Sequence, residues 1–121
     1  MSITAMDLVA SAKQKITEID LQKAKQPLAT ELVLDVREPA EYAAGSLPGA
    51  INIPRGVLEF QIPSHPEFQY MQDANIMVYC QTGGRSALAT EVSNKIGYTK
   101  AVSIAGCFKA WSKNSLHVTQ S

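Results

Sequence analysis

The sequence predicts an α/β domain in which a mainly parallel central sheet is covered by helices on both faces. Strand-like and helix-like segments alternate along the chain, as they do in parallel sheets. The clearest strand segment, residues 76–79, is wholly apolar, as expected for a strand buried on both faces, and a tight loop and a helix follow it directly. At 121 residues and 45% apolar, the chain has the size and composition of one globular domain.

Start and stop signals justify each element in the first half of the chain. Apolar residues spaced along 4–15 predict an amphipathic helix, and a first strand at 16–19 alternates in polarity. Asp20 caps a short helical segment, and Pro39 and Gly45 stand at the start and just past the end of the next helix. The predicted elements are helices over 4–15, 21–25 and 39–44 and strands over 16–19, 31–35 and 50–53.

The second half begins with a polar, proline-punctuated stretch over 54–70 that has room for one helical turn. Gly97 is the expected stop of the helix that follows the cysteine loop. The elements predicted here are strands over 76–79 and 101–104 and helices over 86–96 and 108–113. We expect residues 1–15 to be a helical extension and 16–121 to be the domain proper.

Composition excludes several classes of function. Eleven basic side chains balance eleven acidic ones, so no overall positive field favours nucleic acid or an anionic membrane. Residues 1–16 lack the pattern of a signal peptide, and no run approaches a membrane span, so we expect a cytoplasmic protein.

Two cysteines, Cys80 and Cys107, are too few for a disulfide framework and wrongly spaced for zinc, and neither His65 nor His117 has metal-ligand neighbours. We expect both histidines to be exposed and to form no metal site.

Cys80 is the candidate nucleophile because it lies at the carboxyl end of the central strand, where open α/β sheets place their ligand sites. Gly83 and Gly84 allow successive N–H groups to turn toward the sulfur, and the following helix adds partial positive charge. With Arg85 close by, these donors favour the thiolate; one opposite charge lowers a cysteine pKa by about 1–3 from about 8.5. The alternative is a buried structural cysteine, and we favour the functional thiol because strand, glycines, arginine and helix start coincide.

Four segments resemble the rhodanese family, in the order expected for it. Three of them are Asp-Val-Arg-Glu-Pro-Ala-Glu-Tyr at 35–42, Pro-Gly-Ala-Ile-Asn-Ile-Pro at 48–54, and Val-Tyr-Cys-Gln-Thr-Gly-Gly-Arg-Ser at 78–86; the fourth is Gly-Cys-Phe-Lys-Ala-Trp at 106–111. The resemblance spans roughly residues 16–113, and the joint occurrence of the segments is more specific than any one of them.

The resemblance implies a rhodanese-type sulfurtransferase in which Cys80 takes sulfane sulfur from a donor such as thiosulfate or a persulfide. The resulting persulfide passes its sulfur to a thiol or cyanide. The same relationship implies that Asp35 and Arg37 support the loop or screen donors, although a purely structural buried pair is about equally consistent with the sequence. The loop residues implied to hold the substrate are Gln81, Thr82, Gly83, Gly84, Arg85 and Ser86. The hydroxyls of Thr82 and Ser86 are possible donors to the sulfur, although Ser86 is equally a helix cap.

Phosphatases that share this fold type have five residues between cysteine and arginine, whereas four separate Cys80 from Arg85. The shorter loop favours sulfur over a phosphoryl group, and no Asp or His adjoins Cys80 as an acid.

The chain departs from the family at Ser46 and Leu47, where a histidine is common, and at Cys107, where glycine is usual. Cys107 is either a packed small residue, which we favour, or a thiol that resolves the persulfide.

Three functions remain open from the sequence. The first is an enzyme that turns over a small sulfur donor. The second is a sulfur-relay protein that takes persulfide from one protein and passes it to another, and the third, ranked last, is a silent interaction domain. An open pocket beside Arg37 and Arg85 would favour the enzyme, and an exposed apolar rim around residues 56–62 would favour the sulfur-relay protein.

Phe108 and Trp111 are expected to anchor the core.

Overall fold

A computed structural model describes residues 3–25, 27, 30–106, 108–109 and 111 and confirms the predicted α/β architecture. Its centre is a five-stranded sheet in the order β1-β5-β4-β2-β3, with every pair parallel. The strands are β1 (Glu18–Ile19), β2 (Leu32–Asp35), β3 (Ile51–Asn52), β4 (Ile76–Tyr79) and β5 (Ala101–Ile104). The α-helices are α1 (Ala5–Lys15), α2 (Leu21–Lys25), α3 (Pro39–Ala44), α4 (Leu58–Gln61) and α5 (Gly84–Lys95).

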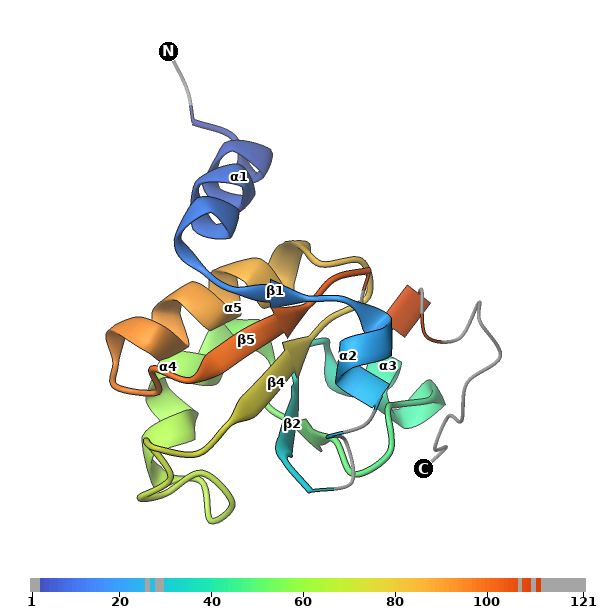
Figure 1. Cartoon of the computed structure of the whole chain (residues 1–121), viewed down its shortest axis with the longest axis vertical. Coiled ribbons are helices and arrows are strands. Elements are labelled where there is room, and N and C mark those ends of the chain that lie inside the picture. Colours follow the sequence, from blue (N-terminus) through green and yellow to red (C-terminus); the bar gives the residue numbers. More distant parts are fainter. Residues whose placement is uncertain (1–2, 26, 28–29, 107, 110, 112–121) are drawn as a thin grey trace.

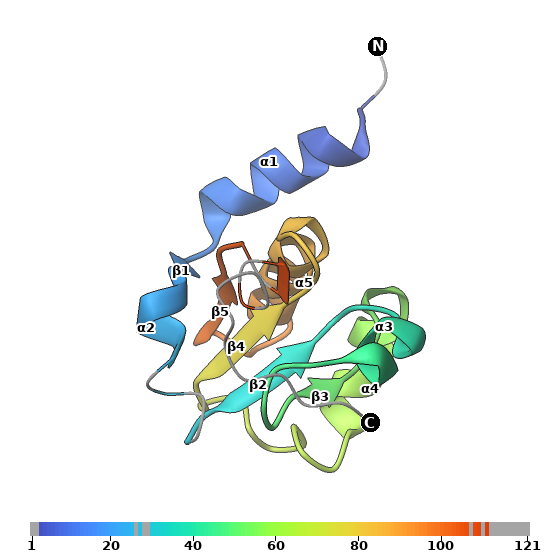
Figure 2. The ribbon, with the colours of Figure 1, turned by 90° about the vertical axis from the view of Figure 1, so that its right-hand side faces the viewer.

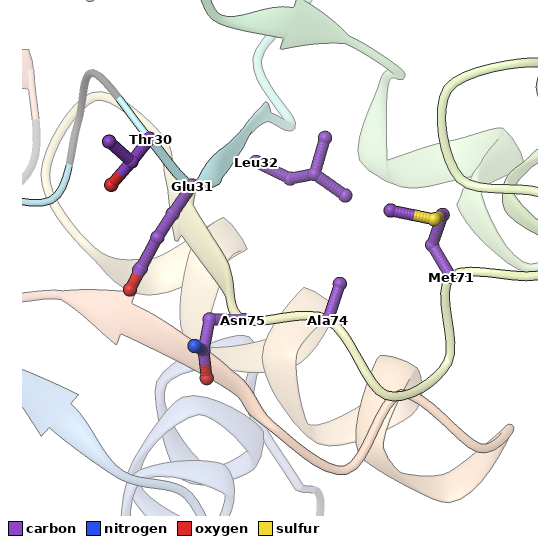
Figure 3. Close-up of a pocket in the computed structure, with 6 residues that line it drawn as sticks. All are labelled: Thr30, Glu31, Leu32, Met71, Ala74 and Asn75. Carbon is purple, nitrogen blue, oxygen red and sulfur yellow. The ribbon is translucent and has the colours of Figure 1, made fainter.

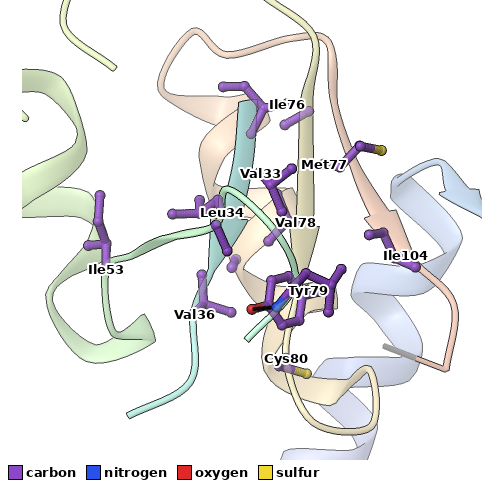
Figure 4. Packing of buried hydrophobic residues seen from close by; sticks show 14 of the residues in the cluster. Val33, Leu34, Val36, Ile53, Ile76, Met77, Val78, Tyr79, Cys80 and Ile104 are labelled. Carbon is purple, nitrogen blue, oxygen red and sulfur yellow. Dashed lines mark hydrogen bonds between the residues drawn. The ribbon is translucent and has the colours of Figure 1, made fainter. Parts of the chain in front are cut away.

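Helices cover both faces of the sheet, as the apolar strands predict. All four residues of β4 are buried, which requires cover on each side. Figures 1 and 2 show α2 on one face and α4 and α5 on the other. Ala24 of α2 and Ala89 of α5 belong to the same apolar cluster around the strands. Figure 4 shows part of this cluster. Trp111 is buried in this cluster and Phe108 packs against it, so their expected role in the core is confirmed.

The carboxyl ends of β2, β3 and β4 meet at one edge of the sheet. Asp35 is in register with Tyr79, and the ladder continues beyond the strands because Val36 N–H donates to the Tyr79 carbonyl over 3.1 Å. The carbonyl of Val36 in turn accepts from Arg55 N–H at 3.1 Å. Residues that follow three different strands are therefore brought together at the edge where Cys80 begins its loop.

The stretch over 54–70 contains more helix than the single turn expected. The 3₁₀ helix η2 (Arg55–Val57), α4 and a second 3₁₀ helix, η3 (Ile62–Ser64), follow one another. Leu58 and Ile62 are both 0% exposed, so a four-residue helical spacing buries two large side chains at once. Tertiary burial here outweighs the local polar and proline signals.

The start of the helix that follows the cysteine loop also differs from the prediction. The helix expected from Ser86 begins at Gly84, because Gly83 has a left-handed φ of +116° and its carbonyl accepts the first helical bond, from Ala87 N–H at 3.1 Å. Of the helix expected over 108–113, Phe108, Lys109 and Trp111 are helical, and the remaining positions lie outside the described residues.

The first helix packs against α5 and forms a second, smaller apolar cluster there. Val9 and Ala12 of α1 meet Ala87 of α5, with Ile16 and Leu88 at the margin. A capping box fixes its start, with Asp7 N–H donating to Thr4 Oγ1 at 3.1 Å and Thr4 N–H donating to Asp7 Oδ2 at 2.9 Å. Within the described part of the chain, no helix combines the length and apolar character needed to cross a bilayer.

Candidate active site

Cys80 directly follows β4, and its side chain is 1% exposed (Figure 4). Three donors or acceptors of the following loop converge on its sulfur. The N–H groups of Gly83 and Ser86 donate to Sγ at 3.1 and 3.2 Å, and Ser86 Oγ lies 3.5 Å away. Two N–H groups of the loop thus turn toward the sulfur, at the amino end of α5, where the helix dipole adds partial positive charge.

Ser86 links this sulfur cradle, formed by Cys80, Gly83 and Ser86, to the neighbouring strand. Its hydroxyl donates to the Gly83 carbonyl at 3.2 Å and shares a 2.9 Å hydrogen bond with Ser103 Oγ of β5. Ser86 and Ser103 are both 0% exposed. Their contact fixes the Ser86 hydroxyl beside the sulfur. Ser103 belongs to no motif in the sequence, so the sequence alone does not predict this role.

Arg85 points to Glu41 of α3, a residue that the sequence did not single out. The guanidinium donates to both carboxylate oxygens, Nη1 to Oε1 at 2.7 Å and Nη2 to Oε2 at 3.0 Å. The hydrogen bond from Arg85 is the main cause that lowers the pKa of Glu41 to about 2. The same bond raises the pKa of Arg85, and the nearby charge of Cys80 raises it further. The arginine is therefore held mainly by a carboxylate.

Arg37 and Asp35 form a buried ion pair at the end of β2, 2% and 0% exposed. Arg37 Nη2 donates to Asp35 Oδ2 at 2.9 Å, and Nε donates to both carboxylate oxygens at 3.2 Å. Nη2 also donates to the Gly45 carbonyl. Tyr79 donates its hydroxyl hydrogen to Asp35 Oδ2 at 2.7 Å. Burial, with the neighbouring Asp35 carboxylate, raises the pKa of Tyr79, so this phenol stays protonated.

The buried pair reaches the sulfur loop through Gln81. Arg37 Nη1 donates to Gln81 Oε1 at 3.4 Å, and the guanidinium carbon lies 4.2 Å from the centre of the Phe108 ring. The carbonyls of Cys80 and Gln81 accept from Phe108 N–H and Lys109 N–H, both at 2.9 Å. These contacts connect the Asp35–Arg37 pair and the segment at 108–109 to the loop that follows Cys80.

The remaining predicted residues are placed as follows. Thr82 is exposed at the tip of the loop, and Gly84 opens α5. His65, expected to be exposed, is half-buried because its ring packs against Phe68, with the ring centres 5.5 Å apart. Cys107 and His117 lie outside the described residues. Among the described residues, no three His, Cys, Asp or Glu side chains are grouped as metal ligands.

A cavity of about 310 Å³ lies at the opposite edge of the sheet (Figure 3). Its walls come from the first residue of β2 and from the segments that precede β2 and β4, at the amino ends of these strands, whereas Cys80 follows the carboxyl end of β4. The lining residues are Thr30, Glu31, Leu32, Met71, Ala74 and Asn75. This cavity is therefore separate from the sulfur cradle.

The fold and the cradle define a class of α/β domain built around a cysteine at the end of a central parallel strand. Residues 19–114 match the rhodanese-like domain family, and the chain belongs to it. It is 40% identical over 98 residues to thiosulfate sulfurtransferase 16, chloroplastic, of Arabidopsis thaliana, covering 74% of this chain and 80% of the relative. It is 35% identical over 88 residues to the human thiosulfate:glutathione sulfurtransferase, covering 65% and 76% of the two chains. These relatives place the chain among rhodanese-type sulfurtransferases.

Solved structures support the same fold. A human single-domain sulfurtransferase superposes with a TM-score of 0.69 at 33% identity, covering 79% of this chain and 95% of that one. A Rhodopseudomonas palustris protein of unknown function, described as a possible tyrosine phosphatase, superposes with a TM-score of 0.84 at 26% identity, covering 98% and 96%. The four-residue interval between Cys80 and Arg85 separates the present chain from the five-residue phosphatase loop.

Proposed function

We propose that this protein transfers sulfane sulfur from a donor such as thiosulfate or a persulfide to a thiol or cyanide through a persulfide on Cys80. The observation that carries the proposal is the convergence of the Gly83 and Ser86 N–H groups on Cys80 Sγ, at 3.1 and 3.2 Å. Fixed N–H donors stabilise a thiolate and would equally stabilise the terminal sulfur anion of a persulfide. One cradle thus serves both halves of the reaction.

In the first half-reaction, the Cys80 thiolate attacks the outer sulfur of thiosulfate. A new S–S bond forms as the old one breaks, and the electron pair of the old bond leaves on sulfite. In the second half, cyanide or an acceptor thiolate attacks the outer sulfur of the persulfide, and the Cys80 thiolate is released. The electrons balance without an external oxidant, and no metal or cofactor takes part. A thiolate nucleophile of this kind needs reducing surroundings, such as the cytoplasm.

The charged residues near the cradle support it by positioning the loop. Arg85 is held by Glu41 at 2.7 and 3.0 Å, and Arg37 is buried against Asp35 at 2.9 Å. Both guanidinium groups are therefore already paired with carboxylates. Arg37 acts on the loop through Gln81, so it is a positioning residue in this proposal, and Cys80 is the catalytic residue.

A second candidate is a carrier that exchanges sulfur with other proteins and turns over small donors slowly. It is favoured by the exposed side chains of Val57 and Phe60, 37% and 83% exposed, within the 56–62 stretch. This stretch begins beside the cradle edge of the sheet, because Arg55 N–H bonds to the carbonyl of Val36. An apolar rim at that edge suits a protein that presents a persulfide.

The proposal is tested by the intact mass of the purified protein after incubation with thiosulfate, followed by thiocyanate release on addition of cyanide. Wild type is expected to gain one sulfur and to turn over, and Cys80→Ser is expected to do neither. Cys107→Ser serves as the matched control and is expected to load sulfur. Normal transfer by Cys80→Ser would exclude the mechanism, whereas loading only from a persulfidated protein would favour the carrier.

A further inference from the structure

The first helix lies directly against the loop that holds Cys80. A Cβ placed on Gly83 would be 3.9 Å from Lys13 Nζ, and one placed on Gly84 would be 3.6 Å from Val9 Cγ2. Gly83 is the residue whose N–H donates to the Cys80 sulfur. Figure 4 shows this helix in pale blue beside the loop of Cys80. The ammonium group of Lys13 therefore stands at the border of the sulfur cradle, although α1 precedes the segment that matches the family.

Lys13 is held in this place by the packing of its helix. Val9 and Ala12, four and one residues before it, are buried against Ala87 of α5. Lys15 adds an ion pair to Glu91 of α5 at 3.3 Å. Contacts on α5 thus fix the carboxyl half of α1, and the base of the Lys13 side chain has a defined position relative to the loop.

The charge of Lys13 is less fully neutralised than that of the two nearby arginines. Its ammonium lies 4.0 Å from Glu18 Oε2, at the outer limit of an ion pair, and the two side chains are 42% and 31% exposed. Arg85 and Arg37, in contrast, make hydrogen bonds of 2.7 and 2.9 Å to their carboxylates. An ammonium has three donors, so Lys13 retains donors for an incoming anion.

We propose that Lys13 is a specificity-determining residue that favours anionic sulfur donors of the thiosulfate class at Cys80. This inference rests on the proposed function. Its positive charge would attract the sulfonate end of the donor while the outer sulfur approaches the thiolate, and it would also stabilise the departing sulfite anion. The helical extension would therefore contribute a residue to the site.

The first experiment measures the charge preference of Cys80 without any sulfur transfer. The full-length protein is alkylated with iodoacetate, which is anionic, or iodoacetamide, which is neutral, and the Cys80 peptide is quantified separately from Cys107 by mass spectrometry. Lys13→Gln is expected to lower the ratio of the iodoacetate rate to the iodoacetamide rate by about two- to fivefold, in line with a partly exposed charge. Lys100→Gln is the matched control, because it removes the same charge from an exposed position just before β5, at the amino ends of the strands, whereas Cys80 lies at their carboxyl ends.

An unchanged ratio in Lys13→Gln, or an equal fall in Lys100→Gln, would overturn the inference. The second experiment measures thiocyanate formation over a range of thiosulfate concentrations and of salt. Lys13→Gln is expected to raise KM for thiosulfate about two- to fivefold with little change in kcat and to reduce the dependence on salt, and Lys13→Arg to restore both. If wild type transfers no sulfur, the proposed function fails, but the alkylation ratio still decides the role of Lys13.

Discussion

The N–H of Gly83 donates to the sulfur of Cys80 over 3.1 Å from a backbone with φ of +116°. This conformation is strongly unfavourable for residues with a Cβ, and it turns the N–H toward the sulfur while the carbonyl starts α5. The next residue, Gly84, lies in the first turn of α5, outside the left-handed region. Of these two adjacent glycines, Gly83 alone is required by its backbone conformation.

Gly83→Ala is expected to destabilise the fold by about 1–2 kcal/mol, because the alanine Cβ opposes the left-handed conformation. Displacement of its N–H from the sulfur should slow persulfide formation at least about tenfold. Gly84→Ala is the matched control and should load sulfur at nearly the wild-type rate, since its Cβ would meet Val9 at an ordinary 3.6 Å. Loading is followed by intact mass and stability by urea unfolding; equal behaviour of the two variants would contradict the conformational argument.

Asp35→Asn is expected to reduce the free energy of unfolding by about 3–5 kcal/mol, because it leaves the buried Arg37 guanidinium without its countercharge. Urea unfolding of this variant, of Arg37→Leu and of the double variant measures the coupling between the two residues. The double variant should lose less than the sum of the single losses. Tyr79→Phe removes the donor to Asp35 and the acceptor of the Leu47 N–H, and it should cost about 1–3 kcal/mol. Strict additivity would show that the two charges do not act as a pair.

Glu41→Gln is expected to lower stability by about 0.5–1 kcal/mol near neutral pH, a value that allows for the partial exposure of the Arg85–Glu41 pair. The folded state lowers the pKa of Glu41 from 4.5 to about 2. The carboxylate therefore stabilises the fold above about pH 4.5, and this contribution is lost as the pH falls from there toward about 2. The difference between wild type and variant in urea unfolding should shrink over this interval.

The control for this pH dependence is Glu59→Gln, which breaks an ion pair to Arg55 of 2.8 Å within one short helical stretch. Such an i,i+4 pair contributes only about 0.3–0.5 kcal/mol. A gap between wild type and Glu41→Gln that stays constant down to pH 2 would show that the Arg85 bond does not stabilise the ionised form.

Local signals were sufficient to predict most of the fold. The apolar run at 76–79 predicted a strand buried on both faces, and the structure places it at the middle of the sheet. Pro39 and Gly45 marked the ends of α3 correctly. The segment over 54–70 was harder, because Leu58 and Ile62 become helical only where both can be buried.

The sequence by itself determined the cysteine loop, because its donors come from neighbouring residues and its shape from the freedom of Gly83 to adopt a positive φ. Only the tertiary structure decided which charges surround that loop. Arg85 bonds to Glu41, and Arg37 bonds to Gln81, and each pair is separated by 44 residues of sequence. Lys13 lies near Gly83 because α1 packs on α5. Such pairings depend on strand order and on the orientation of whole helices, which no local spacing of residues specifies.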